Sequence, residues 1–247
     1  MISIITPAHN EELFIRNCLR SVYAAAKEIS EPVEHIVVLN RCTDNTGEIA
    51  AQLGAKIIYD DSRNLSRIRN KGANKSKGDI LITIDADSQM TSNMLAEILC
   101  KLNSGKYIGG GVKIVPERKS LGIICSLLVV LPFILWHGVS AGMFWCLRKD
   151  YEAIGGFDEK LTCIEDIDFG KRLKKYGKDQ GKRYCTIRKA HIVTSCRKFD
   201  QFGDWYFIKN PMIVYRIFNR DPKYADQFYY DVRSRINEQD TYRQMDC

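Results

Sequence analysis

The sequence lacks the cysteine patterns that mark a disulfide framework or a zinc site. Its nine cysteines are an odd number, and no two of them form a C-x-x-C pair. Scattered thiols in apolar segments are typical of a protein that keeps its cysteines reduced. The chain also enters an apolar, β-like run at residue 2, so we expect no signal peptide. Both observations predict a cytoplasmic protein.

A strong charge imbalance is also absent. The 37 lysine and arginine residues face 30 acidic residues, which gives a net charge of +7 and a pI of about 8.9. The basic residues are dispersed and no nucleic-acid-binding motif occurs, so we expect no nucleic-acid partner. The mild basic excess suits anionic substrates such as phosphates, or an anionic membrane surface.

Charged side chains are missing altogether from residues 120–147. The most apolar part, residues 121–136, is interrupted by Pro132 and is shorter than the roughly 20 apolar residues of a membrane span. Three interpretations stay open: a buried core helix followed by a strand, an interfacial helix that docks on a membrane, or a span. The length criterion favours them in that order.

Internal repeats and low-complexity segments are absent as well, and 247 residues suit one domain with or without an extension. Short β-like apolar runs alternate with helical patterns; the first four runs are residues 2–6, 33–39, 56–59 and 80–84. This rhythm predicts an α/β fold with a mostly parallel, doubly wound sheet flanked by helices. We expect this domain to cover residues 1–198, followed by a helical extension, residues 199–247, that packs on it or on a partner.

A later β-like run, residues 107–115, contains three adjacent glycines at positions 109–111. Glycine allows a ligand or another backbone segment to approach closely, and it also marks bulges and bends. Both interpretations stay open for this run.

The fourth apolar run leads directly into Asp85-Ala86-Asp87. Side chains alternate along a strand, so both carboxylates point the same way at its end. Converging carboxylates repel each other unless a cation lies between them, and Mg²⁺ or Mn²⁺ prefers oxygen ligands. Open α/β sheets bind ligands at this end of their strands. The pattern indicates a metal–diphosphate site; the alternative is a solvated, aspartate-rich turn.

Four sequence blocks stand out at residues 4–12 (IITPAHNEE), 37–46, 69–87 and 155–166. In their order and spacing they resemble family 2 glycosyltransferases of the GT-A fold. The resemblance implies a Rossmann-like GT-A sheet and a hexosyltransferase-type enzyme. Such an enzyme transfers a sugar from a nucleotide-diphosphate sugar to an acceptor hydroxyl, usually with inversion. It uses Mn²⁺ or Mg²⁺ to neutralise the departing diphosphate.

The resemblance also assigns catalytic and metal roles. It makes Asp166 the general base that takes the proton of the acceptor hydroxyl, and the adjacent Glu165 can raise the pKa of this base. It makes Asp87 the metal ligand, with Asp85 beside it. A late histidine, His191, completes the metal shell in this view; the alternative is a hydrogen-bonded strand histidine.

The residues expected to hold the nucleotide match three of the blocks. They are Pro7, Ala8, His9, Asn10, Glu11, Asn40, Arg67, Arg69, Asp85 and Ala86. The first five match the turn that grips the base and ribose, and the two arginines match contacts to the diphosphate or base. A later basic pair, Arg197-Lys198, is at least as consistent with a solvated corner as with an anion contact.

Two positions depart from the family pattern. Leu39 and Asn40 replace paired acids, and Asn40 keeps a carbonyl acceptor for an imide N–H. This favours a UDP-sugar donor and leaves a GDP-sugar open. His9 replaces the usual tyrosine and can still stack on a base.

Other functions and several acceptors stay open. A sugar-nucleotide-binding protein without transferase activity is the alternative function. A nucleotidyltransferase needs a glycine-rich basic loop that residues 7–10 lack. A saccharide, a lipid-linked compound or a small molecule can each be the acceptor. The uncharged segment is compatible with peripheral contact at the inner face of the cell membrane, and a homo-oligomer is also compatible.

Overall fold

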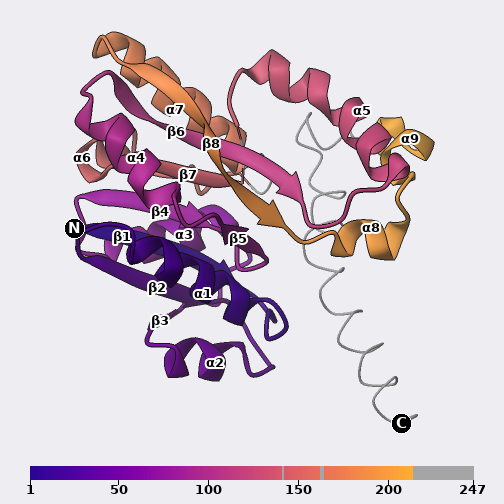
Figure 1. The fold of residues 1–247 in the computed structure, drawn as a ribbon, viewed down its shortest axis with the longest axis horizontal. Helices are drawn as coiled ribbons and strands as arrows, with labels where there is room; N and C mark the ends of the chain where they lie inside the picture. The colour runs from indigo at the N-terminus through magenta and orange to yellow at the C-terminus, as the bar shows by residue number, and fades with distance from the viewer. Residues whose placement is uncertain (141, 162–163, 214–247) are drawn as a thin grey trace.

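One mixed sheet organises the protein. The computed structural model describes residues 1–140, 142–161 and 164–213. The strands of the described residues are β1 (Ile2–Ala8), β2 (Val33–Leu39), β3 (Lys56–Tyr59), β4 (Ile80–Ile84), β5 (Ser88–Met90), β6 (Tyr107–Pro116), β7 (Met143–Leu147) and β8 (Arg183–Thr194). They lie in the order β3-β2-β1-β4-β7-β6-β8-β5 (Figure 1).

The pairing of these strands is mostly parallel. The pairs β3-β2, β2-β1, β1-β4 and β6-β8 are parallel, whereas β4-β7, β7-β6 and β8-β5 are antiparallel. All seven residues of β1 are buried, as expected for a parallel strand that is covered on both faces. The predicted α/β class is confirmed, and β7 adds an antiparallel strand at the centre.

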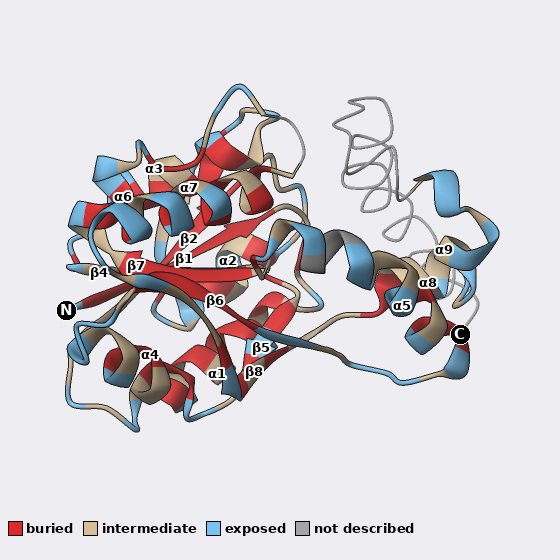
Figure 2. Cartoon of the chain, turned by 90° about the horizontal axis from the view of Figure 1, so that it is seen from above, coloured by how far each residue is buried: buried red, intermediate tan, exposed pale blue. Residues whose placement is uncertain are grey.

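Helices cover both faces of the sheet (Figure 2). They are α1 (Ile15–Ala26), α2 (Thr46–Gln52), α3 (Leu65–Asn74), α4 (Met94–Asn103), α6 (Arg148–Ala153) and α7 (Glu165–Asp179). Val22 of α1 and Ile98 of α4 share one core with Ile82. Leu81, the residue before Ile82 on β4, belongs with Phe169 of α7 to the core on the other face. The alternation of side chains along β4 therefore supplies both cores.

The adjacent glycines of β6 are explained by its neighbouring strands. A Cβ built on Gly110 would overlap the main chain of Cys185 in β8, and one on Gly109 would meet the main chain of Trp145 in β7. Gly109 also has a φ of +150°, a value that favours glycine. Of the two interpretations left open, the close approach is made by backbone on both sides of β6, and the register of β6 with β8 also shifts between Tyr107 and Gly109, as in a bulge.

The uncharged segment forms two different elements. Its second part is β7, which is buried in the sheet. Its first part is α5 (Leu121–His137), which groups with α8 and α9 at one end of the molecule, apart from the helices on the sheet (Figure 1). The exposed apolar side chains of α5 include Leu121, Ile124, Leu127, Leu128, Leu131 and Trp136. The favoured interpretation is therefore right for the strand and wrong for the helix.

The described helices include none that combines the length and the apolarity needed to cross a bilayer.

The predicted C-terminal extension begins in contact with α5. It contains most of α8 (Arg197–Phe202) and all of α9 (Tyr206–Lys209). Ser126 of α5 donates through Oγ to the carbonyl of Asp204 at 2.7 Å, and Arg118 donates through Nη1 to Oδ2 of Asp204 at 2.9 Å. The predicted boundary at residue 198 falls inside α8 and stays a prediction, because residues 214–247 lie outside the described part of the chain.

Candidate active site

The predicted site residues gather at the sheet edge where β1, β2 and β4 end. Ala8 pairs with Leu39 at the ends of β1 and β2, and Ile5 pairs with Thr83, two residues before Asp85. Because these strands are parallel, the turns that follow them meet at one edge, where open α/β sheets bind ligands. The first, second and third sequence blocks are thereby brought together.

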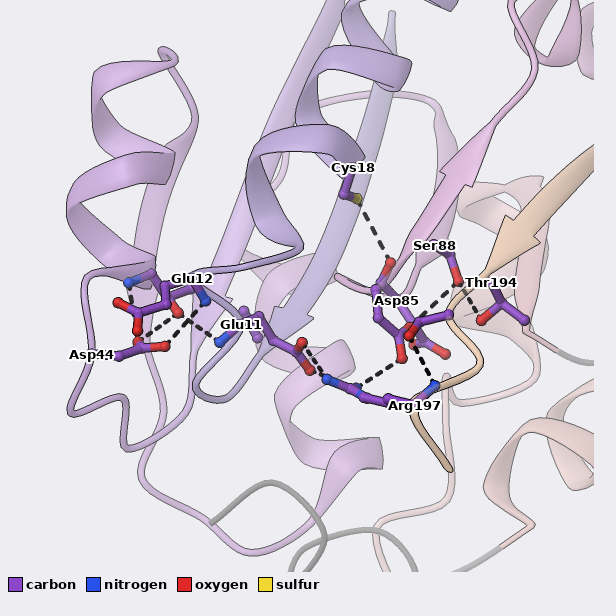
Figure 3. Close-up of polar contacts among 12 residues, drawn as sticks. Glu11, Glu12, Cys18, Asp44, Asp85, Ser88, Thr194 and Arg197 are labelled. Carbon is purple, nitrogen blue, oxygen red and sulfur yellow. Dashed lines mark hydrogen bonds and ion pairs between the residues drawn. The ribbon is translucent and has the colours of Figure 1, made fainter. Parts of the chain in front are cut away.

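Arg197 joins this edge from the far end of the chain (Figure 3). The pairing of β5 with β8 ends where the N–H of Ser195 donates to the carbonyl of Asp87 at 3.1 Å, which places the start of α8 beside the acids. Arg197 Nη1 donates to Glu11 Oε2 at 2.6 Å, and Nη2 donates to Glu11 Oε1 at 2.9 Å and to Asp87 Oδ2 at 2.8 Å. One guanidinium thus links two acids from two blocks.

The Arg197 contacts are shielded from solvent. Glu11 is 2% exposed and Arg197 is 8% exposed. Burial alone would lower the pKa of Arg197, but the charge of Asp87 and the hydrogen bonds to Glu11 outweigh it and raise that pKa. Arg197 is therefore a permanent cation here and not a solvated corner. Because both Glu11 oxygens accept from Arg197, this carboxylate is engaged within the protein.

Arg69 makes a second bridge, from α3. Asn64 caps this helix by accepting the N–H of Arg67 at 2.9 Å. Arg69 Nη1 donates to Glu165 Oε1 at 2.8 Å, and Nη2 donates to Asp85 Oδ1 at 3.0 Å. Burial would lower the pKa of Arg69, but the charges of Asp85 and Glu165 raise it more. Arg69 and Glu165 are 96 residues apart in sequence, so this bridge connects the third sequence block to the fourth.

Asp166 lies in the first turn of α7, directly after the residue that Arg69 holds. Its Oδ1 accepts the N–H of Ile167 at 2.7 Å. Desolvation by burial, followed by the charge of Glu165, raises the pKa of Asp166 to about 7, although the charge of Arg69 opposes the rise. Asp85 also raises it, which shows that the two predicted acids share one electrostatic environment. A carboxyl group with this pKa is suited to accept a proton near neutral pH.

The backbone before α7 adopts an uncommon conformation. Ile164 has a φ of +52°, in the left-handed region that β-branched residues rarely occupy. It immediately precedes Glu165, the residue that fixes Arg69. Strained backbone of this kind concentrates at functional sites, and its position here is consistent with a precise setting of the first turn of α7.

Asn40 presents a single acceptor at the end of β2. Its Nδ2 donates to the carbonyls of Asp60 and Ser62, both at 2.6 Å. Since both partners can only accept, the orientation of the amide is fixed. Asn40 is 1% exposed, and its Oδ1 has no hydrogen-bond partner among the described residues. A buried amide oxygen without a partner is costly, so an N–H group that reached this atom would relieve that cost.

The turn after β1 is held by its own polar contacts. His9 Nδ1 lies 2.5 Å from the carbonyl of Asn40, so Nδ1 carries the hydrogen. Asn10 has a φ of +52°, a region where asparagine is enriched, and its Oδ1 accepts the N–H of Thr43 at 2.8 Å. These bonds join the first block to the loop after β2.

Two predicted site residues lie away from the acid pair. Arg67 is largely exposed, and its Nε is 4.0 Å from Asp60 Oδ2. His191 lies opposite Thr91: its N–H donates to Thr91 Oγ1 at 3.3 Å, and its carbonyl accepts the Thr91 N–H at 3.1 Å. The described residues contain no group of three His, Cys, Asp or Glu side chains that could hold a metal ion. The expected grouping of His191 with the two acids is therefore not formed, because the strand register separates them.

The acid pair still fits a hard divalent cation. Asp85, Asp87, Glu11 and Glu165 bring four carboxylates, whereas Arg69 and Arg197 bring two guanidinium groups. Two negative charges thus stay uncompensated within this set. Mg²⁺ and similar ions commonly bind through one or two carboxylates and complete their shell with substrate phosphates and water. The donor set of Asp85 and Asp87 is of this kind.

Comparison with known proteins agrees with this geometry. Residues 3–124 match the family model described as glycosyl transferase family 2. The chain belongs to glycosyl transferase family 2. This family assignment confirms the resemblance carried by the four sequence blocks.

Curated relatives extend the likeness beyond the matched segment. The undecaprenyl-phosphate 4-deoxy-4-formamido-L-arabinose transferase of Pseudomonas aeruginosa is 24% identical over 201 residues, which cover 77% of this chain and 57% of that protein. The glycosyltransferase GlyA of Streptococcus pneumoniae is 28% identical over 106 residues, 41% of this chain and 15% of that protein. The chain thus spans little more than half the length of the first relative.

Solved structures show the same GT-A fold. S. aureus TarS 1–349 in complex with UDP-GlcNAc superposes with a TM-score of 0.61 at 17% identity, over 94% of this chain and 71% of that chain. Glucosyl-3-phosphoglycerate synthase of Mycobacterium tuberculosis, in complex with Mn²⁺, UDP and glucosyl-3-phosphoglycerate, gives 0.56 at 18% identity, over 87% of this chain and 78% of that chain.

Proposed function

We propose that this family 2 glycosyltransferase transfers a sugar from a UDP-sugar to an acceptor hydroxyl with inversion. The observation that carries the proposal is the environment of Asp166. Its pKa is raised to about 7, and its neighbour Glu165 is tied through Arg69 to Asp85. A proton acceptor and an acid pair suited to a metal–diphosphate complex therefore belong to one network, which is centred on the buried Arg69. The solved neighbours in complex with UDP, UDP-GlcNAc or Mn²⁺ support the same donor class.

The chemistry follows from these positions. Asp166 takes the proton of the acceptor hydroxyl, and the hydroxyl oxygen forms a bond to the anomeric carbon of the sugar. The bond from that carbon to the diphosphate breaks, and UDP leaves with the electron pair. A divalent ion held by Asp85 and Asp87 would supply positive charge to the departing diphosphate. Glu165 serves this step by holding Arg69 and by raising the pKa of Asp166, and not as a second base.

Asn40 is the proposed reader of the nucleobase. Its fixed amide leaves Oδ1 as the acceptor, and the uracil imide N–H is a matching donor. A cytosine or adenine ring presents an acceptor at the equivalent edge and leaves both groups unpaired, which is costly in a buried site. Guanine also carries an N–H donor, so this contact does not separate it from uracil. The affinities for GDP and UDP therefore have to be compared directly.

Calorimetric titration with a modified ligand tests this arrangement without altering the protein. UDP with Mn²⁺ should bind, whereas 3-methyl-UDP, which lacks the imide N–H, should bind about tenfold or more weakly. GDP and CDP serve as comparison ligands, each with and without Mn²⁺. Equal binding of UDP and 3-methyl-UDP would contradict the role of Asn40. Equal binding with and without Mn²⁺ would contradict the metal site.

The alternative is a protein that binds a nucleotide sugar without transferring it. The raised pKa of Asp166 argues against it, because a binding site has no need of a proton acceptor. Release of UDP from a UDP-sugar separates the two functions. If UDP binds but the folded chain releases no UDP with any soluble or lipid-linked acceptor that carries a hydroxyl group, the binding function is favoured.

We also propose that the acceptor is lipid-linked and that α5 contacts the membrane that carries it. The exposed apolar side chains of α5 lie at one end of the molecule, apart from the sheet. The exposed Lys119 lies just before the helix, which suits an anionic bilayer surface. The name of the Pseudomonas aeruginosa relative includes undecaprenyl-phosphate, a lipid carrier. In this proposal the enzyme uses Mn²⁺ or Mg²⁺ and acts at the cytoplasmic face of the membrane.

A further inference from the structure

Arg197 divides its donors unequally between two acids. Nη1 and Nη2 form two bonds with Glu11, a fork geometry that fixes the plane of the guanidinium group. Only Nη2 reaches Asp87, and Nη2 is shared with Glu11. The contact with Asp87 is therefore single and shared, whereas the contact with Glu11 is double.

The single contact uses a carboxylate oxygen that belongs to the proposed metal site. The side chain of Asp87 is 15% exposed and that of Asp85 is 36% exposed, so the two acids reach the surface of the site. The other oxygen of Asp87 lies 3.5 Å from Ser88 Oγ. A guanidinium and a divalent ion at the same carboxylate repel each other. A divalent ion that binds through Asp87 Oδ2 therefore has to displace Arg197 from that oxygen.

We propose that Arg197 is a resident cation on Asp87 that a divalent metal displaces, and that Glu11 keeps Arg197 in place during the exchange. The inference rests on the proposed metal site. It gives Glu11, predicted from sequence to grip the nucleotide, the role of a positioning residue for Arg197. Binding of the metal alone is then weak, because each ion that enters has to break the contact between Arg197 and Asp87.

The structure also shows why Arg197 can let go of Asp87. Its bidentate bond with Glu11 is complete without Asp87, so the guanidinium stays charge-paired after the exchange. Removal of Glu11 alone has the opposite consequence, since Asp87 is then the acid that still accepts a hydrogen bond from Arg197 among the described residues. The two residues of one ion pair therefore have opposite predicted effects on metal affinity.

Titration with Mn²⁺ alone, in the absence of nucleotide, tests the inference. Free Mn²⁺ is followed by electron paramagnetic resonance in the parent chain, in Glu11→Gln and in the double variant Glu11→Gln/Arg197→Met. The double variant removes both partners, so no unpaired charge is left buried as it would be in Arg197→Met alone. It should bind Mn²⁺ about tenfold tighter than the parent, and Glu11→Gln should bind it at least about threefold more weakly.

Two control variants show whether the changes in Mn²⁺ affinity are specific to this ion pair. Arg188→Met removes one positive charge from an exposed position of β8 and should leave Mn²⁺ affinity unchanged. Asp87→Asn should abolish Mn²⁺ binding, and thermal unfolding verifies that each variant is folded. Unchanged or weaker affinity in the double variant, or tighter affinity in Glu11→Gln, overturns the inference. Normal Mn²⁺ behaviour in a chain that releases no UDP would refute the proposed transfer and leave the inference standing.

Discussion

Two arginines each hold one acid of the pair, and their other partners differ. Arg69 shares its donors between one acid of the pair and Glu165, next to the proposed base. Arg197 shares its donors between the other acid and Glu11, in the turn after β1. Both arginines are buried, and the pKa of each is raised by the acids it contacts. The two sides are thus alike in form.

They differ in which event they can control. The charges that act on Asp166 include those of Glu165, Arg69 and Asp85, so in the proposed reaction the Arg69 side acts on proton transfer. The Arg197 side contacts Asp87 and in the same proposal acts on metal binding. The proposed site thus has a proton half around Arg69 and a metal half around Arg197, with Asp85 acting on both arginines, and variants on each side should fail in different ways.

Asp87→Ala breaks the metal half and should have the largest effect. Loss of this carboxylate removes the main metal ligand and several kcal/mol of charge stabilisation, so kcat/KM for UDP release should fall on the order of 10³-fold. Asp61→Asn, which neutralises an exposed carboxylate, is the control and should retain parent activity. Near-normal turnover by folded Asp87→Ala would remove this residue from the metal role.

Asp166→Asn breaks the proton half. The amide cannot take the acceptor proton, so kcat should fall by about 10²–10⁴-fold while the affinity for UDP and Mn²⁺ is retained. Asp168→Asn makes the same change two residues further along α7, where Asp168 pairs with Arg172, and should cost little activity. If Asp166→Asn loses nucleotide affinity together with turnover, the residue binds the donor and is not the base.

The pH dependence of kcat compares the two halves directly. In the parent, kcat should rise with pH through about 7, because Asp166 has to be deprotonated. Glu165→Gln removes a charge that raises the pKa of Asp166, so the rising limb should move down by about one pH unit. The matched change on the other side, Glu11→Gln, should leave the limb in place. Equal shifts in both variants would mean that the two halves are not separate.

The free energy of unfolding should fall as the pH rises, because of the raised pKa of Asp166. Its pKa in the folded chain, about 7, is above its ordinary value of 3.8. The folded state therefore holds more protons than the unfolded state between these values, and stability from this group is lost as pH rises from about 4 to about 7. Asp166→Asn should stabilise the chain relative to the parent at pH 8 by on the order of 1–3 kcal/mol, with no such gain at pH 3. Chemical denaturation at the two pH values measures the difference.

The sequence predicted the position of those site residues that come directly after a strand. Alternation along residues 80–84 and the order of the four blocks were enough to place Asp85, Asp87 and Asn40 at one sheet edge. The role of Arg197 was missed because it depends on the pairing of β5 with β8, and no periodicity links Arg197 to Glu11, 186 residues away. The basic pair Arg197-Lys198 was the available signal, but a basic pair alone does not distinguish an ion pair from a solvated corner.

Strand register and burial explain the remaining differences. The pattern around His191 predicted a strand correctly, but only the register places it opposite Thr91 instead of beside the acids. The composition of α5 fits a core helix and a surface helix equally well. Which one forms depends on whether another element covers it, and that is a tertiary property.

Leu128→Glu addresses the end of the molecule that neither arginine reaches, and it should have the smallest effect on chemistry. Leu128 is 57% exposed on α5, so a charge there should cost little stability, and UDP release with a water-soluble acceptor should stay within about twofold of the parent. Binding to anionic vesicles, measured by flotation, should fall about tenfold, because a charged group enters the interface poorly. Gln52→Glu adds the same charge on α2, far from α5 (Figure 1), and should float as the parent does. If the parent chain itself does not float with vesicles, α5 is not a membrane contact, and the proton and metal halves would then act on a soluble acceptor.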